Sequence, residues 1–124
     1  MKIDIKVNDI QLQARLLANP SAEKIKTVLP LEGRSHVWGE EIYFEIPVQA
    51  EQEADAVEEV TVGTLAYWPP GQALCIFFGP TPVSTGDAPR AYSAVNIVGE
   101  VIGDPRALKT ISEGDLIRIE KTDG

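Results

Sequence analysis

The sequence has few of the residues from which metal centres and covalent catalytic sites are built. Its 124 residues include one cysteine, Cys75, and one histidine, His36. A zinc site of the Cys/His type takes three or four protein ligands, so this class of site is nearly excluded, and one cysteine excludes an internal disulfide. His36 is interpreted as a loop residue that leads into a strand, and Cys75 as a buried, unreactive thiol. We expect neither a metal nor a cofactor.

Basic residues and long apolar runs are also scarce. Lysine and arginine number 11 against 19 aspartate and glutamate residues, which gives a formal net charge of −8. This charge repels phosphate backbones and anionic lipid, so neither nucleic acid nor a membrane surface is an expected partner. No apolar run approaches the roughly 20 residues that span a bilayer. The first residues, MKIDIKVNDI, lack the apolar core of a signal peptide. The protein is expected to be cytoplasmic.

The remaining acidic and glycine-containing motifs do not form a known catalytic pattern. Glu40 and Glu41 are adjacent, so on a strand their side chains point to opposite faces. Glu41 and Glu45 share a face but lie roughly 13 Å apart along an extended chain, too far for paired acid–base work. The segment GPTPVSTG lacks the lysine of a phosphate-binding P-loop. From spacing alone, no enzyme class is indicated.

Most of the chain alternates apolar and polar residues, which is typical of half-buried strands. Residues 3–7 and 10–16 flank an Asn-Asp dipeptide at 8–9, whose residue types tolerate the positive φ of a hairpin turn. The apolar run ALCIFF (73–78) predicts a central strand that is covered on both faces. Gly99 predicts a bulge or bend in a strand. Further strands are expected at residues 42–46, 60–62, 65–68, 95–102 and 117–119.

Two short helices are expected between these strands. The first is capped by Asn19 or Ser21 and ends before Pro30, and the second begins at Asp104 before a proline. Residues 49–59 favour a solvated loop over a weak helix, and residues 84–93 favour a mobile surface loop. Many short strands and two short helices in 124 residues predict one domain, residues 1–124, with a mainly β, closed-barrel fold.

Three segments have a familiar order and spacing: WGEEIYFEIPV (38–48), YWPPGQALCIFFGPTPVS (67–84) and SAVNIVGEVIG (93–103). Together with the short helix before them, they resemble the small bacterial and archaeal cyclophilin-like proteins, a family without an assigned function. The resemblance extends from about Ile3 to Glu120. It implies a closed barrel of eight mostly antiparallel strands, with helices at its ends.

Cyclophilins themselves are peptidyl-prolyl isomerases, but the residues of their active site do not carry over to this sequence. The catalytic arginine falls on Phe44, the glutamine on Ala73, the pocket phenylalanine on Cys75 and the loop tryptophan on Val83. An isomerase with a degenerate site is therefore the alternative function, and enzyme activity stays an open question. If the protein is an enzyme, Glu41 and Arg90 are candidates for its charged group.

The resemblance places a ligand cleft over the outer face of one strand, where Glu41 and Tyr43 share a side. Tyr67 and Trp68 point in opposite directions, so one of them is expected outside the core, and the loop at 84–93 is placed to close over the cleft. The predicted function is a non-catalytic module that binds a peptide segment or a small molecule. In a homodimer, a second copy would instead cover the aromatic residues. The predicted cleft residues are Glu41, Tyr43, Tyr67, Trp68, Phe78, Thr81 and Asn96.

Overall fold

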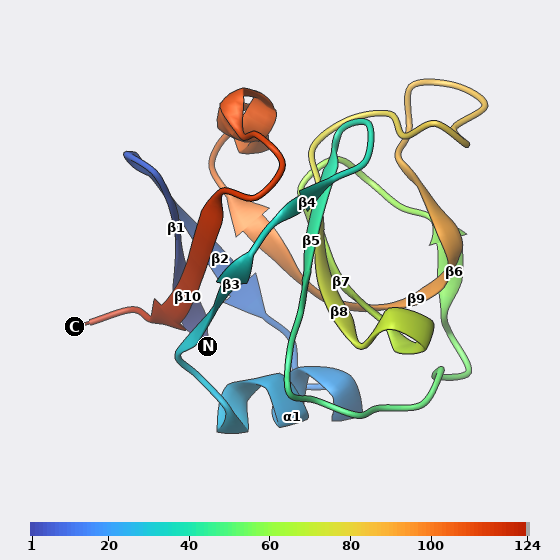
Figure 1. Ribbon diagram of the computed structural model, residues 1–124. Coiled ribbons are helices and arrows are strands. Elements are labelled where there is room, and N and C mark those ends of the chain that lie inside the picture. The colour runs from blue at the N-terminus through green and yellow to red at the C-terminus, as the bar shows by residue number, and fades with distance from the viewer. Residues whose placement is uncertain (124) are drawn as a thin grey trace.

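The computed structural model describes residues 1–123. Its regular secondary structure consists mostly of β-strands (Figure 1). The strands are β1 (Lys2–Val7), β2 (Ile10–Leu16), β3 (Leu31–Arg34), β4 (His36–Val37), β5 (Glu41–Glu45), β6 (Val57–Glu59), β7 (Thr64–Trp68), β8 (Ala73–Phe77), β9 (Arg90–Ile102) and β10 (Leu116–Lys121). The helical segments are α1 (Pro20–Thr27) and the 3₁₀ segments η1 (Pro69–Gly71) and η2 (Pro105–Thr110). The mainly β class predicted from the sequence is confirmed.

The first hairpin forms as its alternation predicts. β1 and β2 pair antiparallel, with Ile5 opposite Leu12, and Asn8 has the positive φ of 56° that the turn requires. Ile3 and Val7 of β1 are fully buried in the main core cluster. One face of the hairpin therefore supplies the core and the other is polar.

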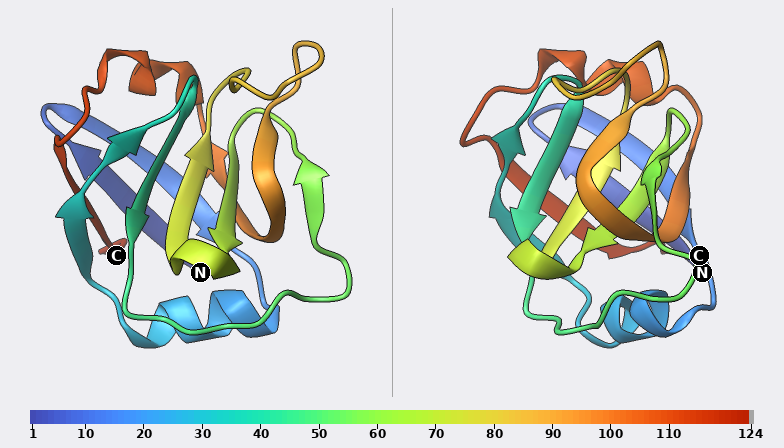
Figure 2. Two further views of the ribbon diagram at one scale, coloured as in Figure 1. Left: turned by 45° about the vertical axis from the view of Figure 1, so that its right-hand side comes forward. Right: turned by 90° about the vertical axis from the view of Figure 1, so that its right-hand side faces the viewer.

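Both expected helices are present, and both begin at the predicted cap. The Asn19 side chain accepts a hydrogen bond of 2.9 Å from the backbone N–H of Ala22 at the start of α1. Asp104 accepts from the backbone N–H of Arg106 in the same way, but η2 is a 3₁₀ rather than an α-helix. The two helices lie at opposite ends of the curved sheet (Figure 2).

The expected closed barrel of eight strands is not confirmed, because the sheet has ten strands and hydrogen bonds do not close it. Its strand order is β3-β10-β1-β2-β9-β7-β8-β5-β4, with β6 paired to β9. The two end strands, β3 and β4, follow one another along the chain and are joined at Ser35. Ser35 is anchored by its backbone N–H and its hydroxyl, which each donate to Asp115 O at 2.8 Å. The covalent chain, rather than a strand ladder, connects the two ends of the sheet.

β8 is buried on both faces, as its uniform apolar sequence predicts. Leu74 and Ile76 pack in the main core, whereas Cys75 and Phe77 belong to a second, smaller cluster between β8 and β9. β9 starts five residues earlier than expected, and Figure 1 shows it curving from β6 on one side to β2 on the other. This curvature makes β9 the cover over the outer face of β7 and β8.

The irregularity predicted at Gly99 is present where β9 crosses between two partner strands. The pairing of β9 with β7 shifts register between Leu65, opposite Gly99, and Ala66, opposite Ile97. A Cβ at position 99 would lie 2.3 Å from the carbonyl oxygen of Arg15 on β2. Only glycine allows this close approach of two backbones.

The prediction for residues 49–62 is wrong in one respect. The expected strand at 60–62 is absent, and β6 forms just before it, within the segment expected to be a loop. Residues 61–64 instead form a turn, in which the N–H of Thr64 donates to Thr61 O at 3.1 Å and Gly63 has a φ of 95°.

Within residues 1–123, no helix has both the length and the apolar composition needed to cross a bilayer.

Candidate ligand-binding pocket

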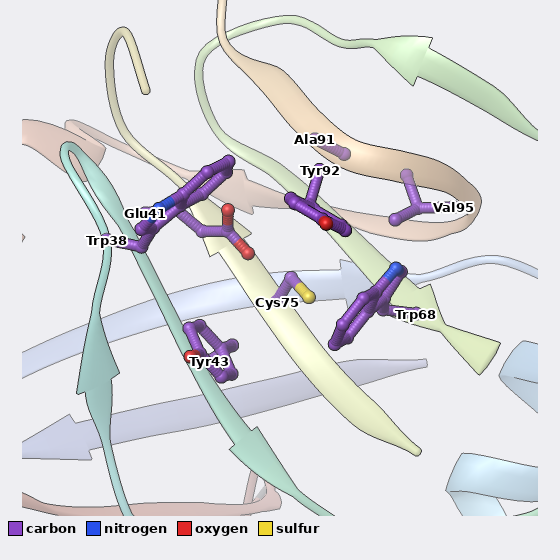
Figure 3. Close-up of a pocket in the computed structure, with 8 residues that line it drawn as sticks. All are labelled: Trp38, Glu41, Tyr43, Trp68, Cys75, Ala91, Tyr92 and Val95. Carbon is purple, nitrogen blue, oxygen red and sulfur yellow. The ribbon is translucent and has the colours of Figure 1, made fainter. Parts of the chain in front are cut away.

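A pocket of about 180 Å³ lies between the outer face of β5 and β8 and the curved strand β9. Figure 3 shows the side chains around it: the four aromatic rings surround the sulfur of Cys75, and the Glu41 carboxyl group points inward. The pocket is lined by Trp38, Glu41, Tyr43, Trp68, Cys75, Ala91, Tyr92 and Val95.

Strand register brings the base of the pocket together. Glu41 and Tyr43 lie two residues apart on β5, so their side chains leave the same face. Tyr43 pairs with Cys75 on β8, and Cys75 pairs in turn with Ala66 on β7. Trp68 follows two residues later on that face of β7. Three neighbouring strands thus place an acid, a thiol and two rings on one surface.

Trp38 enters the pocket from the tight turn before β5. Its N–H donates to Glu41 O at 2.9 Å, and the N–H of Glu41 donates back to Trp38 O at 3.2 Å. Gly39 has a φ of 60°, and a Cβ there would lie 2.9 Å from the Cα of Thr81. The turn is therefore packed directly on the Gly-Pro-Thr-Pro corner at 79–82.

Tyr92 forms the outer wall. Its ring centroid lies 6.1 Å from those of Trp38 and Trp68, and it meets both edge-on, with interplanar angles of 69° and 83°. Such edge-to-face pairs are favourable aromatic arrangements. The indole N–H of Trp68 donates to the Ser93 hydroxyl at 2.7 Å, which fixes the ring. The Tyr92 side chain is nevertheless 73% exposed, so the pocket opens to solvent beside it.

Glu41 is the charged residue of the pocket, and it is only 5% exposed. Burial raises its pKa from the ordinary value of 4.5 to about 7, although the neighbouring Cys75 thiol lowers the pKa in part by hydrogen bonding. Within residues 1–123, no lysine, arginine or histidine forms a salt bridge with it. Burial also raises the pKa of Cys75 well above its usual range, and the nearby Glu41 charge adds to this effect. At neutral pH the pocket holds a carboxyl group that is close to its midpoint of ionisation.

The structure brings together three of the seven residues predicted for the cleft: Glu41, Tyr43 and Trp68. Tyr67 does not line this pocket, since alternation turns it into the main core, where its hydroxyl donates to Val48 O at 2.6 Å. Phe78 also packs in the main core. The expectation that one member of the Tyr67–Trp68 pair lies outside the core is thus correct, and that residue is Trp68.

The two predicted polar residues, Thr81 and Asn96, do not line the pocket either. The Thr81 hydroxyl donates to Arg90 O and so ties the corner at 79–82 to the start of β9. Asn96 is buried and hydrogen-bonds the loop after β5: its amide nitrogen donates to Glu51 O at 2.9 Å, and its oxygen accepts from the N–H of Glu53 at 2.8 Å. Both polar groups hold loops in place.

The sequence analysis missed five lining residues: Trp38, Cys75, Ala91, Tyr92 and Val95. Of these five residues, Trp38 could most readily have been predicted from the sequence. It is the first residue of the WGEEIYF motif and precedes a glycine, and tryptophan is common at binding surfaces. The sequence predicts that Tyr92 lies in a surface loop, but it lies in β9, which begins two residues before it. Arg90 does not reach the pocket, since its guanidinium pairs with Glu58 at 2.9 Å. Among residues 1–123, no cluster of three or more His, Cys, Asp or Glu side chains could hold a metal.

Comparison with known proteins gives a family but no activity. The family model described as cyclophilin-like matches residues 1–120. The solution structure of a hypothetical protein from Archaeoglobus fulgidus is similar to this chain, with 32% sequence identity and a TM-score of 0.82. The match covers 98% of this chain and 95% of the archaeal one. No curated protein matches the sequence.

Proposed function

This chain belongs to the cyclophilin-like family, and from that premise we propose that it is a non-catalytic binding module whose ligand enters the pocket between β5, β8 and β9. The ligand is a small molecule or a side chain of a peptide segment. The observation that carries the proposal is the set of four aromatic residues around an open space of about 180 Å³. Aromatic residues that serve only folding are normally close-packed in the core, whereas these four border a cavity.

The composition of the lining supports binding rather than isomerisation. Prolyl isomerisation of the cyclophilin kind needs an arginine that donates to the twisted amide, and losing such a donor typically costs about 100- to 1000-fold in rate. The residues around the pocket include no arginine or lysine, and Phe44 occupies the position that matches the family arginine. Phe44 points into the main core, away from the pocket.

A second function, proton transfer by Glu41, is favoured by one specific observation. Its pKa of about 7 is the value at which a carboxyl group serves best as a general acid or base at neutral pH. This candidate requires the bound molecule to be chemically changed. Mass spectrometry of probes recovered after incubation with the protein separates the two functions, because a binding module returns them unaltered.

Intrinsic fluorescence tests the binding proposal directly, since both tryptophans of the chain line the pocket. The probes are a short Ala-Pro peptide, choline, and 3,3-dimethyl-1-butanol as a neutral small molecule. At least one probe should change the emission saturably in the wild type. Tyr92→Ala should weaken that response, because it removes an exposed wall of the pocket. Val62→Ala, which shortens another exposed apolar side chain, is the matched control.

The Ala-Pro arm also tests the isomerase alternative. The proposal predicts that the exchange between the cis and trans peptide signals in an NMR exchange spectrum is no faster with the protein present. Faster exchange that Tyr92→Ala abolishes would contradict a non-catalytic role. The absence of a saturable response to all three probes would contradict binding in this pocket.

A further inference from the structure

The chemistry of the pocket identifies one class of ligand, and this inference rests on the proposed function. Two tryptophans and two tyrosines surround the space, and the Trp38 and Trp68 rings stand on either side of Tyr92 (Figure 3). Aromatic faces carry partial negative charge and attract cations placed over them, most strongly in the case of tryptophan. A neutral apolar ligand would be served equally well by leucine or valine, but the lining holds a single valine, Val95, and one alanine.

The charge of the lining has the sign that such a cation requires. Glu41 contributes its carboxyl group to the pocket, and no lysine, arginine or histidine lines it. A carboxyl group that is 5% exposed and has no cationic partner among residues 1–123 is costly for the free protein. A cationic ligand would supply the missing partner. The net charge of −8 also raises the local concentration of cations.

We propose that the pocket binds a methylated ammonium group, which is held among Trp38, Tyr43, Trp68 and Tyr92 with the Glu41 carboxylate as its counter-ion. A primary ammonium is a compact, strongly hydrated charge that needs several hydrogen-bond acceptors. Methyl groups spread the charge and present apolar carbon to the rings. One water occupies about 30 Å³ in the liquid, so a space of about 180 Å³ is large enough for a group of this size. The group can belong to a free small molecule or to a methylated lysine of a peptide.

The binding of the cation should depend on pH through Glu41. The ionised form attracts the cation, so the affinity should be full above the pKa of about 7 and fall as Glu41 is protonated below it. Burial raises the pKa of Cys75 and of Tyr43, so both stay neutral between pH 6 and 8. Other titratable or charged side chains on the surrounding elements include Tyr92 in the pocket, His36 beside Tyr43 and paired with Glu113, Glu40 near Lys109, and Arg90 paired with Glu58. Glu45 is exposed at the other end of β5, and Glu100 is exposed near the end of β9.

The test compares choline with 3,3-dimethyl-1-butanol, which has the same shape but a carbon in place of the charged nitrogen. Calorimetric titration of the wild type at pH 8 should show choline binding about tenfold or more tightly than the neutral analogue. Glu41→Gln should remove most of this preference by weakening the binding of choline. In the wild type, choline should bind about tenfold more weakly at pH 6 than at pH 8. His36→Gln is the matched control and should keep this pH dependence.

A peptide with trimethyllysine and its unmodified lysine counterpart distinguish the two sources of the group. Tighter binding of the methylated peptide than of choline assigns the site to a protein partner, and the reverse order assigns it to a free small molecule. Equal affinity for choline and its neutral analogue would contradict the proposal that the ligand is a cation. It would not contradict the proposal that the protein is a binding module. If neither choline nor the methylated peptide binds, the proposal of a cationic ligand is also wrong. Binding of the Ala-Pro peptide would then still support the proposed binding function.

Discussion

Replacement of Glu41 by glutamine should change how the stability of the protein depends on pH. The carboxyl group has a pKa of about 7 in the folded chain and an ordinary value of 4.5 in the unfolded one. Below pH 4.5 both states are protonated and the group costs nothing. As the pH rises from 4.5 to 7, the unfolded state releases its proton and the folded state retains it, so the folded state loses stability. Above pH 7 the loss is complete.

The size of this effect follows from the pKa difference. Each unit corresponds to about 1.4 kcal/mol, so the wild type should lose about 3 kcal/mol of its free energy of unfolding between pH 4 and pH 8 through this one group. Glutamine cannot ionise and avoids the loss. The difference in free energy of unfolding between Glu41→Gln and the wild type should therefore shift by about 3 kcal/mol in favour of the variant over this range.

Urea denaturation followed by far-ultraviolet circular dichroism at pH 4, 5, 6, 7 and 8 measures this difference. Contributions from other titrating groups cancel between the variant and the wild type. Glu45→Gln, an exposed position on the same strand, is the matched control and should show no comparable trend. A difference between Glu41→Gln and the wild type that stays constant from pH 4 to pH 8 would refute the assignment of a costly buried carboxyl group.

Three further predictions concern the elements that shape the pocket. Asn96→Ala should destabilise the protein by about 2 kcal/mol, because it removes the partner of two part-buried backbone groups and of the buried Ser21 hydroxyl, and should speed amide hydrogen exchange at residues 49–56; unchanged exchange there would contradict its anchoring role. Gly99→Ala should cost about 2 kcal/mol in urea denaturation because its Cβ meets backbone, whereas Gly86→Ala, with open space around it, should cost little. Cys75 should react with a disulfide reagent at pH 8 at least about a hundredfold more slowly than in urea-unfolded protein, and comparable rates would show that the thiol is accessible.

Local pattern was enough to predict most of the fold. The alternation in β1 and β2, the caps at Asn19 and Asp104 and the uniform apolar run of β8 are decided by neighbouring residues, and the structure confirms them. Closure of the sheet was not predictable in this way. The two ends of the sheet, β3 and β4, are adjacent in the sequence, but β3 pairs with β10, more than eighty residues further along the chain, and no local signal predicts that partner.

The candidate site was predicted only where a strand pattern was sufficient. Alternation put Glu41 and Tyr43 on one face of β5, and it put either Tyr67 or Trp68 outside the main core without deciding which one. The family resemblance supplied the position of the cleft. Tyr92 reaches the pocket because β9 curves over β8, and Trp38 because its turn packs on the corner at 79–82. The contact between Tyr92 and Trp38, and that between Gly39 and Thr81, join segments that are about forty residues or more apart in the sequence.

An NMR experiment on labelled protein with choline at pH 8 tests directly whether the pocket binds the cation. The chain has two tryptophans, and both line the pocket. If choline binds there, both indole signals should shift saturably, and the choline methyl protons should give nuclear Overhauser effects to the rings of Trp38, Trp68 and Tyr92. Methyl contacts to residues elsewhere, or indole signals that do not move at saturating choline, would contradict binding of the cation in this pocket.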